Sequence, residues 1–272
     1  MKHELYVADA REMSFIPDES VHLVTTSPPY WNIKDYSGPE DAQIGSMNDY
    51  QEFIGSLYEV WDECHRVLIP GGRMVCVVGD VMMSRKKFGR HFSVPLHADI
   101  ARGCVDLGFD YLSPIIWYKI SNISFEYGKN NYLGTPYAPN GIIKNEIEYI
   151  LLFRKPGNYR KPTVRQKEKS AIPKEEYDTM FSQIWTITGT STKKGHPAPY
   201  PLPLAERLVR MFSYVDDVVL DPFVGSGTTC LAAANWERSS IGVDISDEYI
   251  ELSEKKMRKA GHDVETFGVV EG

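Results

Sequence analysis

The sequence is short of the residues that build disulfide frameworks and metal centres. It has only four cysteines, Cys64, Cys76, Cys104 and Cys230, and no two of them form a C-x-x-C pair. The seven histidines include no H-x-x-x-H spacing. These absences exclude the common zinc motifs and argue against a secreted disulfide scaffold. We therefore expect reduced, partly buried thiols and no bound metal.

Long hydrophobic runs are also missing. No uninterrupted apolar run approaches the roughly 18 residues of a membrane-spanning helix. The first residues, MKHELYVADAR, lack the apolar stretch of a secretory signal. Hydrophobic residues still make up 42% of the 272 residues, which is enough for a large core. We expect a cytoplasmic protein with no membrane partner, formed as one large α/β domain or two small ones.

Positive charge is in deficit overall but concentrated in one segment. The net charge of −7 by itself argues against a nucleic-acid partner. Residues 154–174, however, contain eight basic residues and a single acid, Glu168. Shorter basic clusters lie at Arg85, Lys86 and Lys87 with Arg90, and at Lys193 and Lys194. Such runs form either a solvated face or a polyanion-binding surface, and composition alone leaves both open.

Strand and helix patterns alternate along the first 120 residues. Short buried strands are predicted over 5–8, 21–25, 74–78 and 111–118, and helices over 49–68 and 94–107. This alternation is typical of a mostly parallel sheet with helices on both faces. A loop is expected over 121–145 and a strand over 147–153. The basic segment 154–184, with prolines at 156, 162 and 173, is interpreted as an insertion or mobile arm.

The region 218–245 has the pattern of a nucleoside-binding βαβ unit. A strand over 218–220 leads into the turn DPFVGSG, a helix over 228–235 and a strand over 240–243 that ends in Asp244. Glycines let the backbone approach a ligand, and an acid after the second strand can accept hydrogen bonds from ribose hydroxyls. Cys230 occupies the third glycine position of dinucleotide enzymes, and Asp221 would repel a pyrophosphate. Both features favour S-adenosylmethionine, which carries cationic groups and no phosphate, over NAD.

The stretch TTSPPYW, residues 25–31, follows the apolar run of the second strand. Each proline fixes φ and removes a backbone donor, so the pair ends the strand. On its own this is a turn without chemistry.

TSPPY followed much later by DPFVGSGTT resembles the motif pair of the β-class DNA amino-methyltransferases, in which the catalytic half precedes the cofactor half. HPAPYPLPLAERL, 196–208, resembles the segment that closes over the methionine part of the cofactor in that class. Asp9, in ADAR, resembles the family position near the cofactor adenine. These matches span nearly the whole chain. They imply an α/β, Rossmann-like S-adenosylmethionine-dependent methyltransferase fold with a circularly permuted motif order.

The resemblance also implies an organisation and a set of site residues. It implies one catalytic domain over 1–272, with a catalytic half at 1–120, a cofactor half at 185–272, and an inserted loop and basic segment at 121–184 for DNA target recognition. The catalytic residues would be Ser27, Pro28, Pro29 and Tyr30. The cofactor, S-adenosyl-L-methionine, would contact Asp9, Ala10, His196, Pro197, Asp221, Pro222, Phe223, Gly225, Ser226, Gly227, Thr228, Asp244 and Ile245. DNA would contact Arg85, Lys86, Lys87, Arg160, Lys161, Arg165, Lys167, Lys193 and Lys194.

The chemistry of the implied reaction explains the residue types in SPPY. An exocyclic base amine is a weak nucleophile because its lone pair is delocalised into the ring. Ser27 Oγ and the Pro28 carbonyl can accept hydrogen bonds from its two N–H groups, and the prolines hold the carbonyl rigidly. Tyr30 offers a face on which an extruded base can stack. Direct attack on the methyl group would follow, without a covalent enzyme intermediate.

The head of the tetrad bears on the choice of base. In the family, Ser at this position usually accompanies cytosine N4, and Asp or Asn usually accompanies adenine N6, so Ser27 favours cytosine. Adenine N6, an RNA substrate and a non-catalytic DNA-binding relative remain alternatives. The expected partners are double-stranded DNA and, as a candidate, a cognate restriction endonuclease. The protein would act at the prokaryotic nucleoid as a monomer or homodimer.

Overall fold

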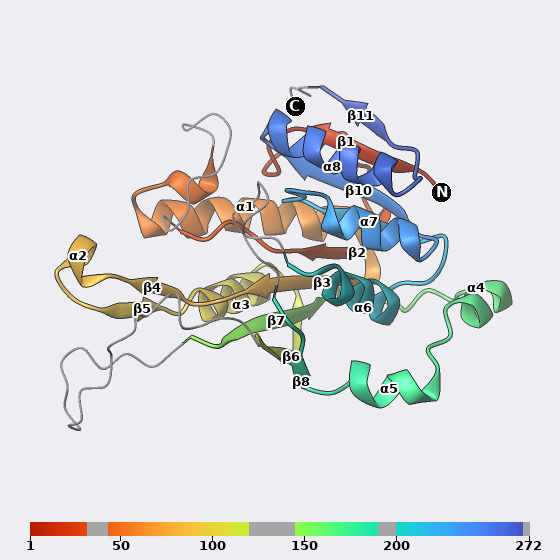
Figure 1. The fold of residues 1–272 in the computed structure, drawn as a ribbon, viewed down its shortest axis with the longest axis horizontal. Helices are drawn as coiled ribbons and strands as arrows, with labels where there is room; N and C mark the ends of the chain where they lie inside the picture. Colours follow the sequence, from red (N-terminus) through yellow and green to blue (C-terminus); the bar gives the residue numbers. More distant parts are fainter. Residues whose placement is uncertain (32–42, 120–144, 190–199, 269–272) are drawn as a thin grey trace.

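The computed structural model describes residues 1–31, 43–119, 145–189 and 200–268. Within them one nine-stranded sheet organises the molecule (Figure 1). From one edge to the other its strands are β11 (Glu265–Phe267), β1 (His3–Val7), β10 (Ser239–Asp244), β9 (Val218–Asp221), β2 (Val21–Thr26), β3 (Leu68–Val78), β7 (Ile147–Arg154), β6 (Asp110–Tyr118) and β8 (Ile184–Thr186).

The sheet is mostly parallel, which confirms the predicted fold class. Every neighbouring pair is parallel except the two pairs made by β7, which runs antiparallel to β3 and to β6. In register, Gly242 lies opposite Asp221 and Asp244 lies opposite Val7. The carboxyl ends of β1, β10, β9, β2 and β3 therefore meet at one edge of the sheet, called here the carboxyl edge.

Helices cover both faces of the sheet. One face packs against α1 (Tyr50–Val67) and α3 (Leu96–Asp106), through buried side chains such as Leu57 and Ile100. The other face packs against α6 (Leu202–Phe212), α7 (Thr228–Asn235) and α8 (Asp247–Lys259). Burial on both faces explains why the central strands read as continuous apolar runs. Among the described residues, no helix is long and apolar enough to cross a membrane.

Local capping signals position the predicted helices closely. The Asp49 side chain accepts from the backbone N–H groups of Gln51 and Glu52 and begins α1, as expected. Ser246 caps α8 through Tyr249 N at 3.4 Å. The helix expected over 94–107 begins at Leu96 instead, because residues 92–94 form a strand. The strand expected over 74–78 begins earlier, at Leu68, and runs through Pro70, Gly71 and Gly72.

Several short elements were not predicted. β4 (Val81–Met83) and β5 (Phe92–Val94) form an antiparallel hairpin with α2 (Arg85–Phe88) at its tip. The 3-10 turn η2 (Ile44–Ser46) precedes α1. The basic segment contains α4 (Val164–Lys169) and α5 (Lys174–Met180). In Figure 1 the hairpin and α4 lie at opposite ends of the molecule.

The described part of the expected insertion over 121–184 does not form one separate unit. β7 lies inside the sheet between β3 and β6, and Ile150, Leu151 and Phe153 are fully buried. The expected strand at 147–153 is confirmed as a core element. Among the described residues of this stretch, residues 155–183 lie outside the sheet and are called here the basic strap. Most of the expected 121–145 loop lies outside the described residues. All four cysteines are buried and free, and Trp31, Trp117 and Trp185 are buried as well.

Candidate functional site

The glycine turn after β9 is held against α8. Gly225 and Gly227 have φ of 48° and 76°, a left-handed region that favours glycine. A Cβ on Gly227 would lie 2.8 Å from Ser253 Oγ, so a larger residue would collide with α8. Ser253 Oγ donates to the Gly225 carbonyl at 2.7 Å. These contacts with Ser253 on α8 therefore fix the turn, and its backbone remains close to the carboxyl edge.

The missing third glycine is compensated on the neighbouring strand. Cys230 is buried in α7, where dinucleotide enzymes use glycine to bring helix and strand together. Opposite it, Gly242 in β10 has no side chain, and a Cβ there would lie 3.0 Å from Cys230 Sγ and 2.7 Å from Val224 Cγ2. Gly242 thus supplies the space that Cys230 takes up.

Asp244 presents a carboxylate at the end of β10. Its Oδ2 accepts from Gly225 N at 2.9 Å and its Oδ1 accepts from Ser246 N at 3.0 Å. Burial raises the pKa of this carboxyl to about 6. The backbone carbonyl of Asp244 accepts from Ala8 N at 3.0 Å, so Asp9 and Ala10 follow β1 at the neighbouring position of the edge. Asp9 is paired there with Arg11 at 2.6 Å.

Asp221 lies beneath the glycine turn and not open at the surface. It is 2% exposed and accepts hydrogen bonds from Thr26 Oγ1 at 2.6 Å, Thr229 Oγ1 at 2.5 Å and Phe223 N at 3.1 Å. Burial raises its pKa to about 6. The Tyr200 hydroxyl bonds the same Thr229 hydroxyl. In this arrangement the carboxylate ties β2, β9 and α7 together.

Lys256 is a site residue that sequence reasoning missed. From α8 its Nζ donates to Ser226 Oγ and Thr228 Oγ1, both at 3.1 Å, and burial lowers its pKa. A lysine near the C-terminal end of a helix ordinarily complements the helix dipole. Nothing local in the sequence indicated that it reaches back to the glycine turn.

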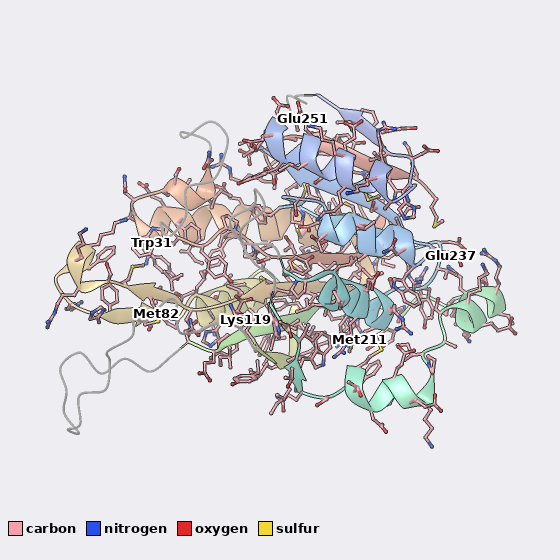
Figure 2. All side chains as sticks on the ribbon, viewed as in Figure 1. Trp31, Met82, Lys119, Met211, Glu237 and Glu251 are labelled. Atoms are coloured by element: carbon pink, nitrogen blue, oxygen red, sulfur yellow. The ribbon has the colours of Figure 1, made fainter. Side chains whose placement is uncertain are left out.

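The SPPY turn follows β2 at the same edge. Ser27 comes directly after Thr26, whose hydroxyl bonds Asp221. The Tyr30 hydroxyl accepts from Gly79 N at 3.2 Å, at the end of β3. Trp31 Nε1 donates to the Met47 carbonyl at 2.9 Å, which anchors the far end of the turn near α1 (Figure 2). The edge thus carries, side by side, a glycine turn with carboxylates and a proline-fixed turn with an aromatic ring.

The structure describes two of the three groups of expected DNA-contacting residues. Arg85, Lys86 and Lys87 are exposed in α2, at the tip of the hairpin that leaves the carboxyl end of β3 (Figure 1). Lys193 and Lys194 lie outside the described residues, as do His196 and Pro197 of the expected cofactor set. The basic strap carries the others, Arg160, Lys161, Arg165 and Lys167.

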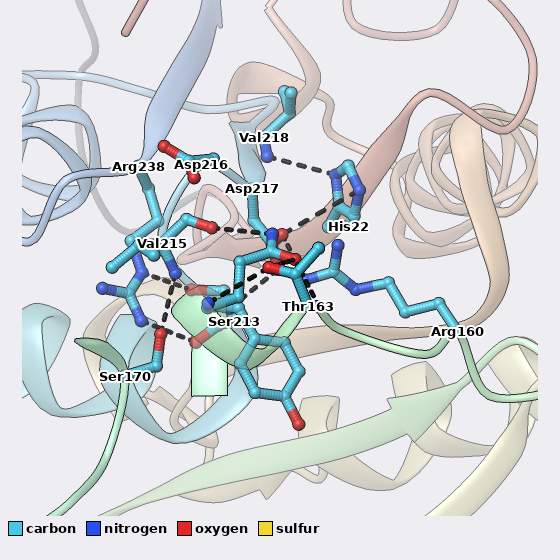
Figure 3. Close-up of polar contacts among 12 residues, drawn as sticks. His22, Arg160, Thr163, Ser170, Ser213, Val215, Asp216, Asp217, Val218 and Arg238 are labelled. Atoms are coloured by element: carbon cyan, nitrogen blue, oxygen red, sulfur yellow. Dashed lines mark hydrogen bonds and ion pairs between the residues drawn. The ribbon is translucent and has the colours of Figure 1, made fainter. Parts of the chain in front are cut away.

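The basic strap lies at the opposite edge of the sheet from the SPPY turn. Arg160 pairs with Asp217, just before β9 begins (Figure 3). Arg165 pairs with the neighbouring Asp216. Lys169 pairs with Glu237 at 2.7 Å. The acids of the body thus neutralise part of the segment's positive charge, a long-range pairing that the sequence could not show. The structure thus places Arg160 and Arg165 away from the edge where the SPPY turn and the glycine turn lie.

Comparison of sequences finds relatives over most of the chain. Residues 21–255 match a family described as DNA methylase, of the N6/N4 type. Type II methyltransferase M.MjaI of Methanocaldococcus jannaschii is 38% identical over 94% of this chain and 91% of that protein. Type II methyltransferase M.MthZI of Methanothermobacter thermautotrophicus is 34% identical over 94% of this chain and 77% of that protein.

Solved structures are similar along nearly their full length. A candidate DNA modification methylase of Thermus thermophilus, in complex with S-adenosyl-L-methionine, is 50% identical with a TM-score of 0.79, covering 97% of this chain and 99% of that one. PvuII DNA methyltransferase, described as cytosine-N4-specific, has a TM-score of 0.67 at 22% identity, covering 93% of this chain and 86% of that one. At that identity the second likeness supports the fold alone.

Proposed function

The chain belongs to the N6/N4 DNA methylase family, and we propose that it transfers a methyl group from S-adenosyl-L-methionine to the N4 amine of a cytosine flipped out of double-stranded DNA. One observation carries the proposal: the SPPY turn and the glycine turn leave adjacent strands at one edge and are joined by the bond from Thr26 to Asp221. A methyl donor held by one turn would then lie next to an amine held by the other.

The cofactor half fits S-adenosyl-L-methionine. Gly225 and Gly227 leave the backbone open to a ligand, and Asp244, partly exposed at the end of β10, offers acceptors for ribose hydroxyls. Asp9, Ala10 and Ile245 flank that position, with Pro222, Phe223, Ser226 and Thr228 on the turn. Asp221 adds negative charge beneath the turn, favourable to a cationic amino group although its oxygens already accept three hydrogen bonds. Bound there, the cofactor supplies a methyl group activated by its positively charged sulfur.

The catalytic half holds and orients the amine. We assign Ser27 Oγ and the Pro28 carbonyl as acceptors for its two N–H groups, with Pro29 stiffening the turn. Tyr30 provides the stacking face, and its hydroxyl bond to Gly79 N fixes the ring against the end of β3. Because both acceptors are set before the reaction, little orientation entropy is lost as the nitrogen becomes pyramidal.

Cytosine N4 is favoured over adenine N6 by the serine at the head of the tetrad. The second candidate, adenine N6, uses the same acceptors, because both bases present an exocyclic amine. The match to a DNA methylase family and the type II relatives support double-stranded DNA as the partner. A cognate restriction endonuclease remains a prediction.

For DNA contact we propose the hairpin Val81–Val94 with Arg85, Lys86 and Lys87. Its tip is exposed and basic, and it leaves the sheet from the same edge as the SPPY turn. Phosphate contacts of this kind set the register of the duplex without reading its sequence. The basic strap does not enter this proposal, because its arginines pair with acids at the far edge.

The test is incubation with methyl-labelled cofactor and mixed-sequence DNA, followed by digestion to nucleosides and mass identification. Labelled N4-methylcytosine is the expected product. Labelled N6-methyladenine would replace the first proposal by the second. DNA that binds but carries no label would contradict both and indicate a non-catalytic relative.

A further inference from the structure

A partly buried ion pair lies at the carboxyl edge, on strands that the SPPY turn does not use. Lys119 directly follows β6 and pairs with Glu148, the second residue of β7; Lys119 is labelled in Figure 2. The two side chains are 28% and 15% exposed. The backbone of Lys119 donates to the Glu146 carbonyl at 2.9 Å, which extends the β6–β7 ladder by one step and fixes where its side chain begins.

Gly79 connects this pair to the catalytic turn. Val77 and Val78 pair with Ile150 and Tyr149 across β3 and β7, so Glu148 is next in register to Gly79. A Cβ on Gly79 would lie 3.1 Å from Glu148 Cγ and 3.6 Å from the Tyr30 hydroxyl oxygen. Glu148 and Tyr30 therefore both border the same glycine, and Gly79 N also donates to Tyr30.

The ion pair contributes little to the stability of the fold by itself. Taking two charges partly out of water costs free energy that their attraction only roughly returns. Lys119 Nζ also lies 5.6 Å from the centre of the Trp117 ring, whose Nε1 donates to the Ile187 carbonyl at 2.8 Å. The ammonium group is thus held between an aromatic face and a carboxylate, and that carboxylate's side chain borders Gly79 as Tyr30 does.

We propose that Lys119, positioned by Glu148, donates hydrogen bonds to the ring edge of the flipped target base. The inference rests on the proposed function and deepens it. Ser27 Oγ and the Pro28 carbonyl are assigned as acceptors for the two amine N–H groups, so the ring acceptors beside that amine call for a donor from another residue. An ammonium has three N–H groups, and the bond to Glu148 leaves two. Cytosine presents two such acceptors next to each other, N3 and O2, whereas adenine presents only N1 on that side.

The test compares three variants, Lys119→Met, Glu148→Gln and the double variant. Both variants that lack Lys119 should lose about 10- to 100-fold in kcat/KM on DNA, because a charged donor to the base is missing. Affinity for S-adenosyl-L-methionine, measured by calorimetry, should not change. Binding to a duplex with an abasic site at the methylated position should also be equal to that of the wild type, since no base is there to contact.

The double variant separates recognition from structure. If the pair only balances two partly buried charges, neutralising both should restore the activity lost in Lys119→Met, and that result would overturn the proposal. Glu254→Gln on α8, which breaks the pair with Arg258 at 2.8 Å, serves as the matched control and should retain full activity. If the wild-type protein labels DNA and the Lys119 variants keep the same kcat/KM, this inference alone is overturned. Unlabelled DNA with the wild type would instead overturn the proposed function, and the inference with it.

Discussion

Thr26 Oγ1 donates a hydrogen bond of 2.6 Å to Asp221 Oδ1, and both residues are buried. The bond joins the last residue of β2 to the last residue of β9, two strands that lie far apart in sequence and next to each other in the sheet. Ser27, the first residue of the SPPY turn, directly follows Thr26. Pro222, which leads into the glycines of the other turn, directly follows Asp221. A substitution at either residue should therefore disturb the positions of both turns.

Asp221 should make the stability of the cofactor-free protein depend on pH. Burial raises the pKa of this carboxyl from 3.8 to about 6. The folded state then holds a proton that the unfolded state releases between about pH 4 and 6, so this group's contribution is full below pH 4 and is lost as pH rises to 6. For a shift of this size the loss is about 3 kcal/mol. Asp221→Asn should remove that dependence.

The measurement is chemical unfolding of both proteins from pH 4.5 to 7.5 without cofactor. The difference in unfolding free energy, wild type minus variant, should fall as pH rises and level off above about pH 6.5. Asp244, whose pKa is also raised to about 6, keeps a similar dependence in the variant. Parallel curves for the two proteins would mean that Asp221 titrates with an ordinary pKa.

Gly227→Ala should damage the cofactor turn beyond the cost of its backbone conformation. The residue has φ +76°, and its new Cβ would lie 2.8 Å from Ser253 Oγ. Gly261→Ala is the matched control, because Gly261 has φ +86° with no neighbouring atom within 4 Å. The control should lose about 1 kcal/mol of unfolding free energy. Gly227→Ala should lose more and also bind S-adenosyl-L-methionine at least tenfold less tightly, by calorimetry; equal effects would exclude the collision.

The parts of the fold that the sequence predicted depend on local signals. Asp49 and Ser246 cap their helices through bonds two or three residues away, and the turn from Asp221 to Gly227 has its own backbone requirements. The region of the candidate site therefore followed from its motifs. β4 and β5 escaped prediction because three residues carry too little periodicity to distinguish a strand from a loop.

The partners of charged side chains were not predictable in the same way. Arg160 belongs to a segment of high positive charge, and its partner Asp217 is far along the chain. Lys256 and Lys119 meet their partners Ser226 and Glu148 only because α8 and β7 pack where they do. Charge composition reports how many basic residues a segment has, whereas the fold decides which acids they meet.

Removing the hairpin charges should weaken DNA binding through the phosphates. The triple variant Arg85→Ala, Lys86→Ala, Lys87→Ala should reduce the slope of log K against log salt by about 0.9 for each phosphate that is no longer neutralised. The matched control is Lys161→Ala with Lys167→Ala, two exposed charges on the basic strap. That control should bind DNA with the wild-type slope. A reduced slope in the control would return the strap to the DNA interface.

Ser27→Ala should separate catalysis from cofactor binding. The hydroxyl is assigned to the target amine, where its bond strengthens as the nitrogen becomes pyramidal and more positive. Loss of one such preorganised acceptor costs about 10²- to 10³-fold in turnover. Thr26, the neighbouring residue that bonds Asp221, provides the contrast, because Thr26→Val breaks the link to the cofactor turn and should raise the Kd for S-adenosyl-L-methionine.

Single-turnover rates and calorimetric Kd values on both variants decide the point. Ser27→Ala should keep the wild-type Kd and lose rate, and Thr26→Val should show the larger change in Kd. A common loss of both quantities in Ser27→Ala would mean that the serine supports the edge as a whole and does not act at the amine. Because the two residues are consecutive and differ in the group they bond, the comparison isolates the chemical assignment from general damage to β2.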